Sequence, residues 1–181
     1  MKSKTKDIVF IGASAAIIAV CAWITVPVGA VPITLQTLAV CLVSGLLGYK
    51  KGTLSVLVYI LLGAVGVPVF SGFKGGVGVL LGATGGYIIG FIFTSLIVGL
   101  ISEKAEKRFV LIVAGMIAGI AVCYAFGTLW FALVFARSGE EKALSSILSM
   151  CVIPFIIPDI VKVVIAALLV QKLHPLISKL K

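Results

Sequence analysis

Long stretches without a charged residue are the feature that most restricts the fold of this chain. No Asp, Glu, Lys or Arg occurs between Asp7 and Lys50, and further uncharged runs cover residues 52–73, 75–102 and 109–136. Each run is long enough to cross a bilayer as a helix, which takes about 20 apolar residues. Only 12% of the residues are charged and the mean hydropathy is +1.30. The sequence therefore predicts an integral membrane protein of the all-α class.

The first uncharged run is too long for one helix and is interrupted in its middle by Pro27, Gly29 and Pro32. Proline removes a backbone donor and blocks continuation of a helix, so this run is expected to form two helices joined by a tight apolar loop. The prediction is a single domain over residues 1–181 with six transmembrane helices, at residues 8–26, 35–49, 53–66, 82–102, 110–135 and 147–171.

Basic residues gather on one side of this predicted topology. If the N-terminus is cytoplasmic, the outside loops hold only Lys74, Arg137 and Lys142, and most of the remaining Lys and Arg residues lie inside. The positive-inside rule then places both termini of this multi-pass protein in the cytoplasm. The net charge of +9 is explained by attraction to anionic membrane lipid, so no nucleic-acid partner is predicted.

Asp159 and Lys162 lie in the predicted helix at residues 147–171, which is otherwise largely apolar. They are three residues apart and therefore on the same face of that helix. Each charge costs about 2.5–3.5 kcal/mol at the centre of a membrane helix, so the two are expected to be paired. The pair could fasten the helix to the bundle, form part of a ligand pocket, or act as acid and base in a membrane enzyme. Pro158 is expected in the first turn of a restarted helix.

Other sequence patterns limit the chemistry that the chain can perform. The stretch "GLLGYKKGT" approaches a phosphate-binding loop but has the wrong spacing, so no ATP-binding motif is predicted. His174 is the only histidine, and the four cysteines are isolated, so no metal site or bound cofactor is expected. Recognition of a ligand fits these few polar groups better than enzymatic catalysis.

Small residues recur at three- and four-residue intervals in the first predicted helix: Gly12, Ala15, Ala16 and Ala19. Glycines at positions 78, 82, 86 and 90 form a second such series. Both patterns are typical of close packing within a bundle, and the first could also form a docking surface for another membrane subunit.

The two predicted outside loops, "PVGAVPITLQ" and "GVPVFSGFKGG", are unusually apolar for segments that only connect helices. Irregular backbone at membrane depth is tolerated where it is buried in protein or lines a cavity. These loops, the second of which carries Phe70 and Phe73, are therefore expected to fold inward and cover a cavity.

Three segments resemble, in order and spacing, the BioY family, which comprises the biotin-specific S components (substrate-binding subunits) of energy-coupling-factor (ECF) transporters. These segments are "VPITLQTLAV", "GVPVFSGFKGGVGVLLGATGGYIIGF" and "VIPFIIPDIVKVVIAALL". One departure is Ala83, where the family commonly has proline in GPTGGY. The resemblance implies a six-helix subunit that binds biotin from outside. It also implies a separate coupling module, made of a transmembrane subunit and a pair of ATPases, which docks on the face around Ala15 and Ala19.

The resemblance also implies a set of ligand contacts. Asp159 would accept from the ureido N–H groups of biotin, and Lys162 would bind either the ureido oxygen or the tail carboxylate. The remaining implied contacts are Thr34, Gln36, Phe70, Phe73, Thr84, Gly85, Gly86 and Tyr87. Recognition of a different small vitamin, with the same fold and docking face, is the alternative within this class.

Overall fold

Five apolar helical segments in the described part of the chain have the length and composition needed to cross a membrane. The computed structural model describes residues 2–27, 31–105, 108–137, 139 and 143–180. Gly29 and Lys142, which the sequence analysis named, lie outside these residues. The elements are α1 (Lys2–Trp23), β1 (Thr25–Val26), β2 (Ile33–Thr34), α2 (Gln36–Ala64), α3 (Val77–Leu81), α4 (Gly85–Lys104), α5 (Phe109–Arg137), α6 (Leu144–Cys151) and α7 (Ile153–Leu180).

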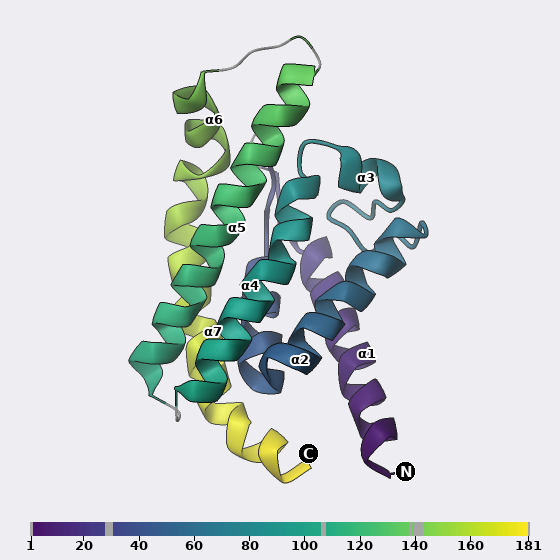
Figure 1. The fold of residues 1–181 in the computed structure, drawn as a ribbon, viewed down its shortest axis with the longest axis vertical. Coiled ribbons are helices and arrows are strands. Elements are labelled where there is room, and N and C mark those ends of the chain that lie inside the picture. Colours follow the sequence, from purple (N-terminus) through teal and green to yellow (C-terminus); the bar gives the residue numbers. More distant parts are fainter. Residues whose placement is uncertain (1, 28–30, 106–107, 138, 140–142, 181) are drawn as a thin grey trace.

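The long helices form a bundle in which the N-terminus and the C-terminus lie at the same end (Figure 1). Helices α3 and α6 lie toward the opposite end, and α5 runs beside α4 along the bundle (Figure 1). The all-α prediction agrees with this architecture.

Helix α2 consists of two helical arms, because Gly48 interrupts it with φ 79° and ψ 179°. The arms, at residues 36–47 and 49–64, correspond to the predicted spans at 35–49 and 53–66. A positive φ is readily adopted only by glycine, which explains why the break falls at Gly48. Glu103 at the end of α4 accepts a hydrogen bond from the Tyr49 backbone N–H at 3.2 Å, which satisfies one donor that the break leaves without a helical partner.

The loop between α1 and α2 contains a short antiparallel hairpin that was not predicted. Thr25 pairs with Thr34 and Val26 pairs with Ile33. The Thr34 hydroxyl then accepts a hydrogen bond from the backbone N–H of Gln36 at 3.2 Å, at the first residue of α2. The hairpin therefore fixes where α2 begins.

The last predicted span is divided into α6 and α7 by Val152, whose φ of −125° and ψ of −55° are not helical. Pro154 lies in the first turn of α7, where its missing N–H has no helical partner to lose. The prediction that Pro158 occupies a first-turn position is wrong, because Pro158 lies inside α7. The helix restarts at Ile153, five residues before Pro158, because Val152 already breaks it.

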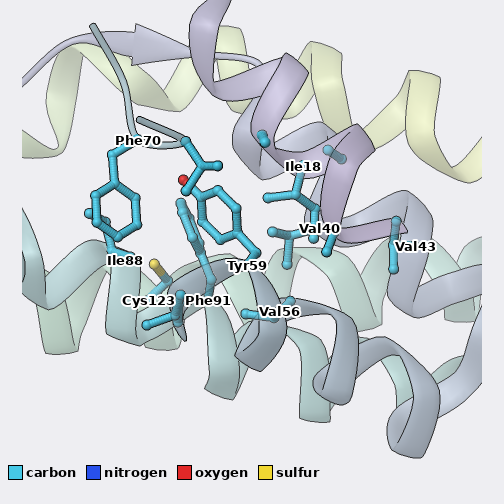
Figure 2. Packing of buried hydrophobic residues seen from close by; sticks show 14 of the residues in the cluster. Ile18, Val40, Val43, Val56, Tyr59, Phe70, Ile88, Phe91 and Cys123 are labelled. Carbon is cyan, nitrogen blue, oxygen red and sulfur yellow. The ribbon is translucent and has the colours of Figure 1, made fainter. Parts of the chain in front are cut away.

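The expectation of one docking face on α1 needs correction. Ala15 and Ala19 are 2% and 5% exposed and pack in the apolar core with Ile18 and Val40, whereas Gly12 and Ala16 are exposed. Figure 2 shows Ile18 of α1 beside Val40 in this core. The small side chains of Ala15 and Ala19 allow α1 to approach the rest of the bundle, so these two alanines are not available to an outside partner.

The glycine series at positions 78–90 also serves more than one purpose. A Cβ on Gly86 would lie 2.2 Å from the Cβ of Trp130, and one on Gly90 would lie 2.9 Å from the sulfur of Cys123. These two glycines allow α5 to pack closely against α4. Gly78, in contrast, has open space around it, so it is not part of a packing ridge.

Gly99 provides a test of the packing between α4 and the break in α2. A Cβ at this position would lie 2.4 Å from the Tyr49 backbone nitrogen, which cannot move without shifting the second arm. We expect Gly99→Ala to destabilise the detergent-solubilised protein by about 1–3 kcal/mol, measured as a lower midpoint of thermal unfolding. Gly12→Ala is the matched control, because its Cβ meets no atom within 4 Å. Equal midpoints for the two variants would contradict this account.

Candidate functional site

Asp159 and Lys162 form a buried ion pair in the first half of α7. The Lys162 Nζ lies 2.8 Å from Asp159 Oδ1, and the two residues are 7% and 4% exposed. Their spacing of three residues places both side chains on one face of the helix. The pairing expected from the cost of unpaired charge in an apolar environment is confirmed.

Two hydroxyl groups from other helices complete this cluster. The Thr37 hydroxyl, in the first turn of α2, donates to Asp159 Oδ1 at 2.9 Å and accepts from Lys162 Nζ at 3.3 Å. The Tyr124 hydroxyl of α5 donates to Asp159 Oδ2 at 2.5 Å. The ion pair thus joins α2, α5 and α7, and neither charge depends on a single partner.

A second polar group lies beside the ion pair, where α2 begins. The Gln36 side-chain amide donates to the Tyr59 hydroxyl at 2.6 Å, and its Oε1 accepts from the Thr34 hydroxyl at 3.1 Å. Gln36 is 5% exposed and Tyr59 is fully buried. Phe70 packs edge-on against the Tyr59 ring with centroids 5.6 Å apart. Figure 2 labels both side chains. Tyr59 therefore holds both the Gln36 amide, through a hydrogen bond, and the Phe70 ring, through an aromatic contact.

These side chains surround a cavity of about 340 Å³. Its walls also include apolar side chains from α4, α5 and α7, among them Phe91, Ile120 and Phe155. The polar and charged residues that line it are Thr25, Thr34, Gln36, Thr37, Ser71, Lys74, Thr84, Tyr87, Thr94, Tyr124, Asp159 and Lys162. The cavity is large enough for a small organic molecule, since typical ligand pockets measure about 300–1,000 Å³.

The structure brings most of the predicted contact residues together around this cavity. The ones that line it are Asp159, Lys162, Thr34, Gln36, Phe70, Thr84 and Tyr87. Tyr87 also lies within hydrogen-bond distance of the Thr128 hydroxyl, at 3.1 Å. The two apolar loops that were expected to cover a cavity contribute Val31, Pro32 and Ser71 to its lining.

Three predicted contacts lie elsewhere. Phe73 is 64% exposed and stacks on Trp23 with ring centroids 5.1 Å apart. Gly85 and Gly86 are buried at the start of α4 and are not among the lining residues. A Cβ on Gly85 would overlap the Leu80 backbone, so this glycine is required for the turn between α3 and α4. In this structure Phe73, Gly85 and Gly86 lie against other parts of the protein and are not among the residues that line the cavity.

Sequence reasoning missed Thr37 and Tyr124. A hydroxyl in an apolar helix is common and carries no pattern that links it to a residue far along the chain. Thr37 lies 122 positions from Asp159, and Tyr124 lies 35 positions from it. The one available signal was the requirement that a buried carboxylate be hydrogen-bonded, which predicts donors but does not identify them.

Among the described residues, no group of three or more His, Cys, Asp or Glu side chains is placed to hold a metal ion. The side chains around Asp159 and Lys162 are suited to hydrogen bonding with an organic ligand. The fold and the cavity together define a polytopic helical membrane protein with an internal polar site.

Comparison with known proteins identifies the family. The model of the BioY family matches residues 1–179. The chain is 43% identical over 171 residues to the biotin transporter BioY of Thermotoga maritima, covering 94% of this chain and 97% of the relative. It is 41% identical over 171 residues to the probable biotin transporter BioY of Pyrococcus horikoshii, covering 94% and 98%. The chain therefore belongs to the BioY family.

A solved structure agrees with this assignment. The crystal structure at 2.1 Å of the S-component for biotin from an ECF-type ABC transporter matches with a TM-score of 0.85 at 27% identity. The match covers 96% of this chain and 93% of the other. The family resemblance stated from three sequence segments is confirmed, and the relatives are named as transporters, not as enzymes.

The ion pair predicts a distinctive pattern of stability. We expect Asp159→Asn and Lys162→Met each to destabilise the protein by about 3–5 kcal/mol, because each leaves one buried charge without its partner. The double variant should recover much of this loss, since it leaves no charge. Thermal unfolding of the four proteins in detergent measures the coupling.

The ion pair between Lys51 and Asp7 serves as the matched control. The side chains of Lys51 and Asp7 are 26% and 37% exposed. A double-mutant cycle on this pair should therefore give a coupling energy of only about 0–1 kcal/mol. If the losses for Asp159→Asn and Lys162→Met simply add in the double variant, the two charges do not depend on each other and this account is wrong.

Proposed function

We propose that this chain is the S component of an ECF transporter, which binds biotin and takes it across the membrane with energy supplied by a separate coupling module. The observation that carries the proposal is the Asp159–Lys162 cluster at the wall of a cavity of ligand size. The relatives named as biotin transporters support the choice of ligand.

The hydrogen bonds of the cluster leave capacity for a cyclic urea. An ammonium group has three N–H donors, and the described partners of Lys162, which are Asp159 and Thr37, use two. A carboxylate accepts about four hydrogen bonds, and Asp159 receives three, from Thr37, Lys162 and Tyr124. One donor and one acceptor therefore remain, which complement the carbonyl and an N–H of the ureido ring of biotin.

The remaining walls fit the rest of the ligand. Phe70, Phe91, Ile120 and Phe155 present apolar surface to the cavity. The sulfur-containing ring and the aliphatic tail of biotin are apolar and would be buried against such walls. Thr34, Gln36 and Tyr87 are proposed as additional contacts because they line the same cavity.

The topology that we propose has six spans, counting the two arms of α2 separately, with both termini in the cytoplasm. The excess of basic residues at the end of the bundle that carries the termini supports this orientation. The cavity then lies toward the outer face of the cytoplasmic membrane, where a ligand arrives.

The docking surface for the coupling module is proposed on the exposed side of α1, at Gly12 and Ala16. Only 28% of the α1 span is buried inside the protein, compared with 56% of the α4 span. Small exposed side chains allow a partner helix to approach closely, and a Cβ on Gly12 meets no other atom within 4 Å. This surface replaces the one around Ala15 and Ala19, which are buried.

Binding of labelled biotin to the purified protein tests the proposed ligand. We expect saturable binding to the wild type, recovery of the ligand chemically unchanged, and no displacement by excess riboflavin or thiamine. The double variant Asp159→Asn with Lys162→Met should weaken binding at least about 100-fold, since two hydrogen bonds to charged groups are worth about 1.5–3 kcal/mol each. Its recovered stability separates loss of binding from loss of folding.

Other outcomes of the same assay identify the alternatives. Wild-type-like binding of biotin to the double variant would mean that the ion pair is only a structural clamp. If another vitamin displaced labelled biotin more readily than unlabelled biotin does, that vitamin would be the ligand of the same fold. A chemically altered ligand would indicate an enzyme.

Bulk added at Ala16 tests the docking surface. We expect Ala16→Leu to reduce biotin uptake by cells that also produce the coupling module, while biotin binding to the purified variant stays unchanged. Ala121→Leu is the matched control, because Ala121 is exposed on α5, away from the proposed surface. Equal uptake by the two variants would exclude the exposed face of α1 as the docking surface.

A further inference from the structure

Lys74 lies in a tight turn that directs it toward the cavity. Phe70 and Lys74 exchange two backbone hydrogen bonds, at 2.9 and 3.3 Å, as an antiparallel bridge. Gly72 and Phe73 at the tip have φ values of 72° and 56°, which reverse the chain. Residues directly opposite in an antiparallel pair project to the same side. Both Phe70 and Lys74 accordingly line the cavity.

The two side chains differ in depth. Phe70 is 1% exposed and packs on Tyr59, whereas Lys74 is exposed. The Thr25 hydroxyl lies 3.1 Å from the Ser71 hydroxyl, which holds the turn to the hairpin between α1 and α2. Lys74 is therefore placed at the mouth of the cavity by a turn that is fixed on both sides. Within the described part of the chain, no acidic side chain forms an ion pair with Lys74.

The charges of the lining residues do not balance. Asp159, Lys162 and Lys74 are the charged residues among the described ones that line the cavity. Asp159 and Lys162 neutralise each other at 2.8 Å, which leaves one net positive charge, at Lys74. A cavity with this arrangement is complementary to a ligand that has a neutral polar head and one negative charge at its outer end.

We propose that Lys74 binds the carboxylate at the end of the ligand's aliphatic chain and so determines specificity for the free acid. This inference rests on the proposed function, in which the ureido ring lies against Asp159 and Lys162. It also assigns Lys162 to the ureido oxygen. A carboxylate placed beside Lys162 would add a second negative charge next to Asp159 in an apolar interior, where unbalanced charge is costly.

Competition between biotin and its neutral primary amide tests this assignment. The affinity of each compound is measured by its displacement of labelled biotin from four proteins: the wild type, Lys74→Gln, Lys74→Arg and the control Arg137→Gln. Arg137 is an exposed cation at the end of α5 and is not among the lining residues. We expect the wild type to prefer the acid over the amide by about two- to fivefold, the effect of one ion pair at an exposed side chain.

In Lys74→Gln the preference for the acid over the amide should disappear, because the acid binds more weakly while the amide keeps its wild-type affinity. Lys74→Arg and Arg137→Gln should keep the preference. Added salt should reduce it in the wild type, because an exposed charge is screened. An undiminished preference in Lys74→Gln, or no preference in the wild type, would overturn the role of Lys74. Failure of the wild type to bind either compound would overturn the proposed function itself.

Discussion

The ion pair between Asp159 and Lys162 imposes requirements on the whole bundle. A charge in an apolar interior is tolerated only when it is paired and hydrogen-bonded, so the surrounding helices must supply polar groups at fixed places. Helix α2 supplies Thr37 and helix α5 supplies Tyr124, at 2.9 and 2.5 Å from the carboxylate oxygens. Three helices that are distant in sequence are thereby held in one relative position, which is also what a preformed ligand site requires.

The backbone around the site is shaped to bring these helices together. The hairpin of Thr25 with Thr34 sets the first residue of α2, so that Gln36 and Thr37 fall in its first turn beside the cavity. The break at Gly48 allows the second arm of α2 to carry Tyr59 back to Gln36. Each irregular segment therefore has a consequence for the position of a lining side chain.

The sequence predicted the features that arise from burial of charge and from helix length. The uncharged runs identified the helices, and the isolation of Asp159 and Lys162 identified an ion pair that lines the cavity. It did not predict Thr37 or Tyr124, because long-range contacts of hydroxyl groups leave no periodic pattern. It also could not distinguish the buried side of α1 from its exposed side: Ala15 and Ala16 are equally small, yet one is 2% exposed and the other lies on the surface.

A comparison of two buried polar clusters explains why one of them suits a ligand. The first cluster lies where the first arm of α2 packs against α4. The Ser44 hydroxyl of α2 lies 2.6 Å from the Val40 carbonyl oxygen and 2.7 Å from the Ser95 hydroxyl of α4, and both serines are fully buried. A hydroxyl has only one hydrogen, so when Ser44 donates to the Val40 carbonyl it accepts from Ser95, which in turn accepts from Thr53. This cluster therefore joins helices and has no unused donor. The cluster of Asp159 and Lys162 also joins helices, but it carries charge, keeps one donor and one acceptor unused, and borders a cavity. A ligand needs a cavity and unused hydrogen-bonding groups at its wall, and helix packing requires neither.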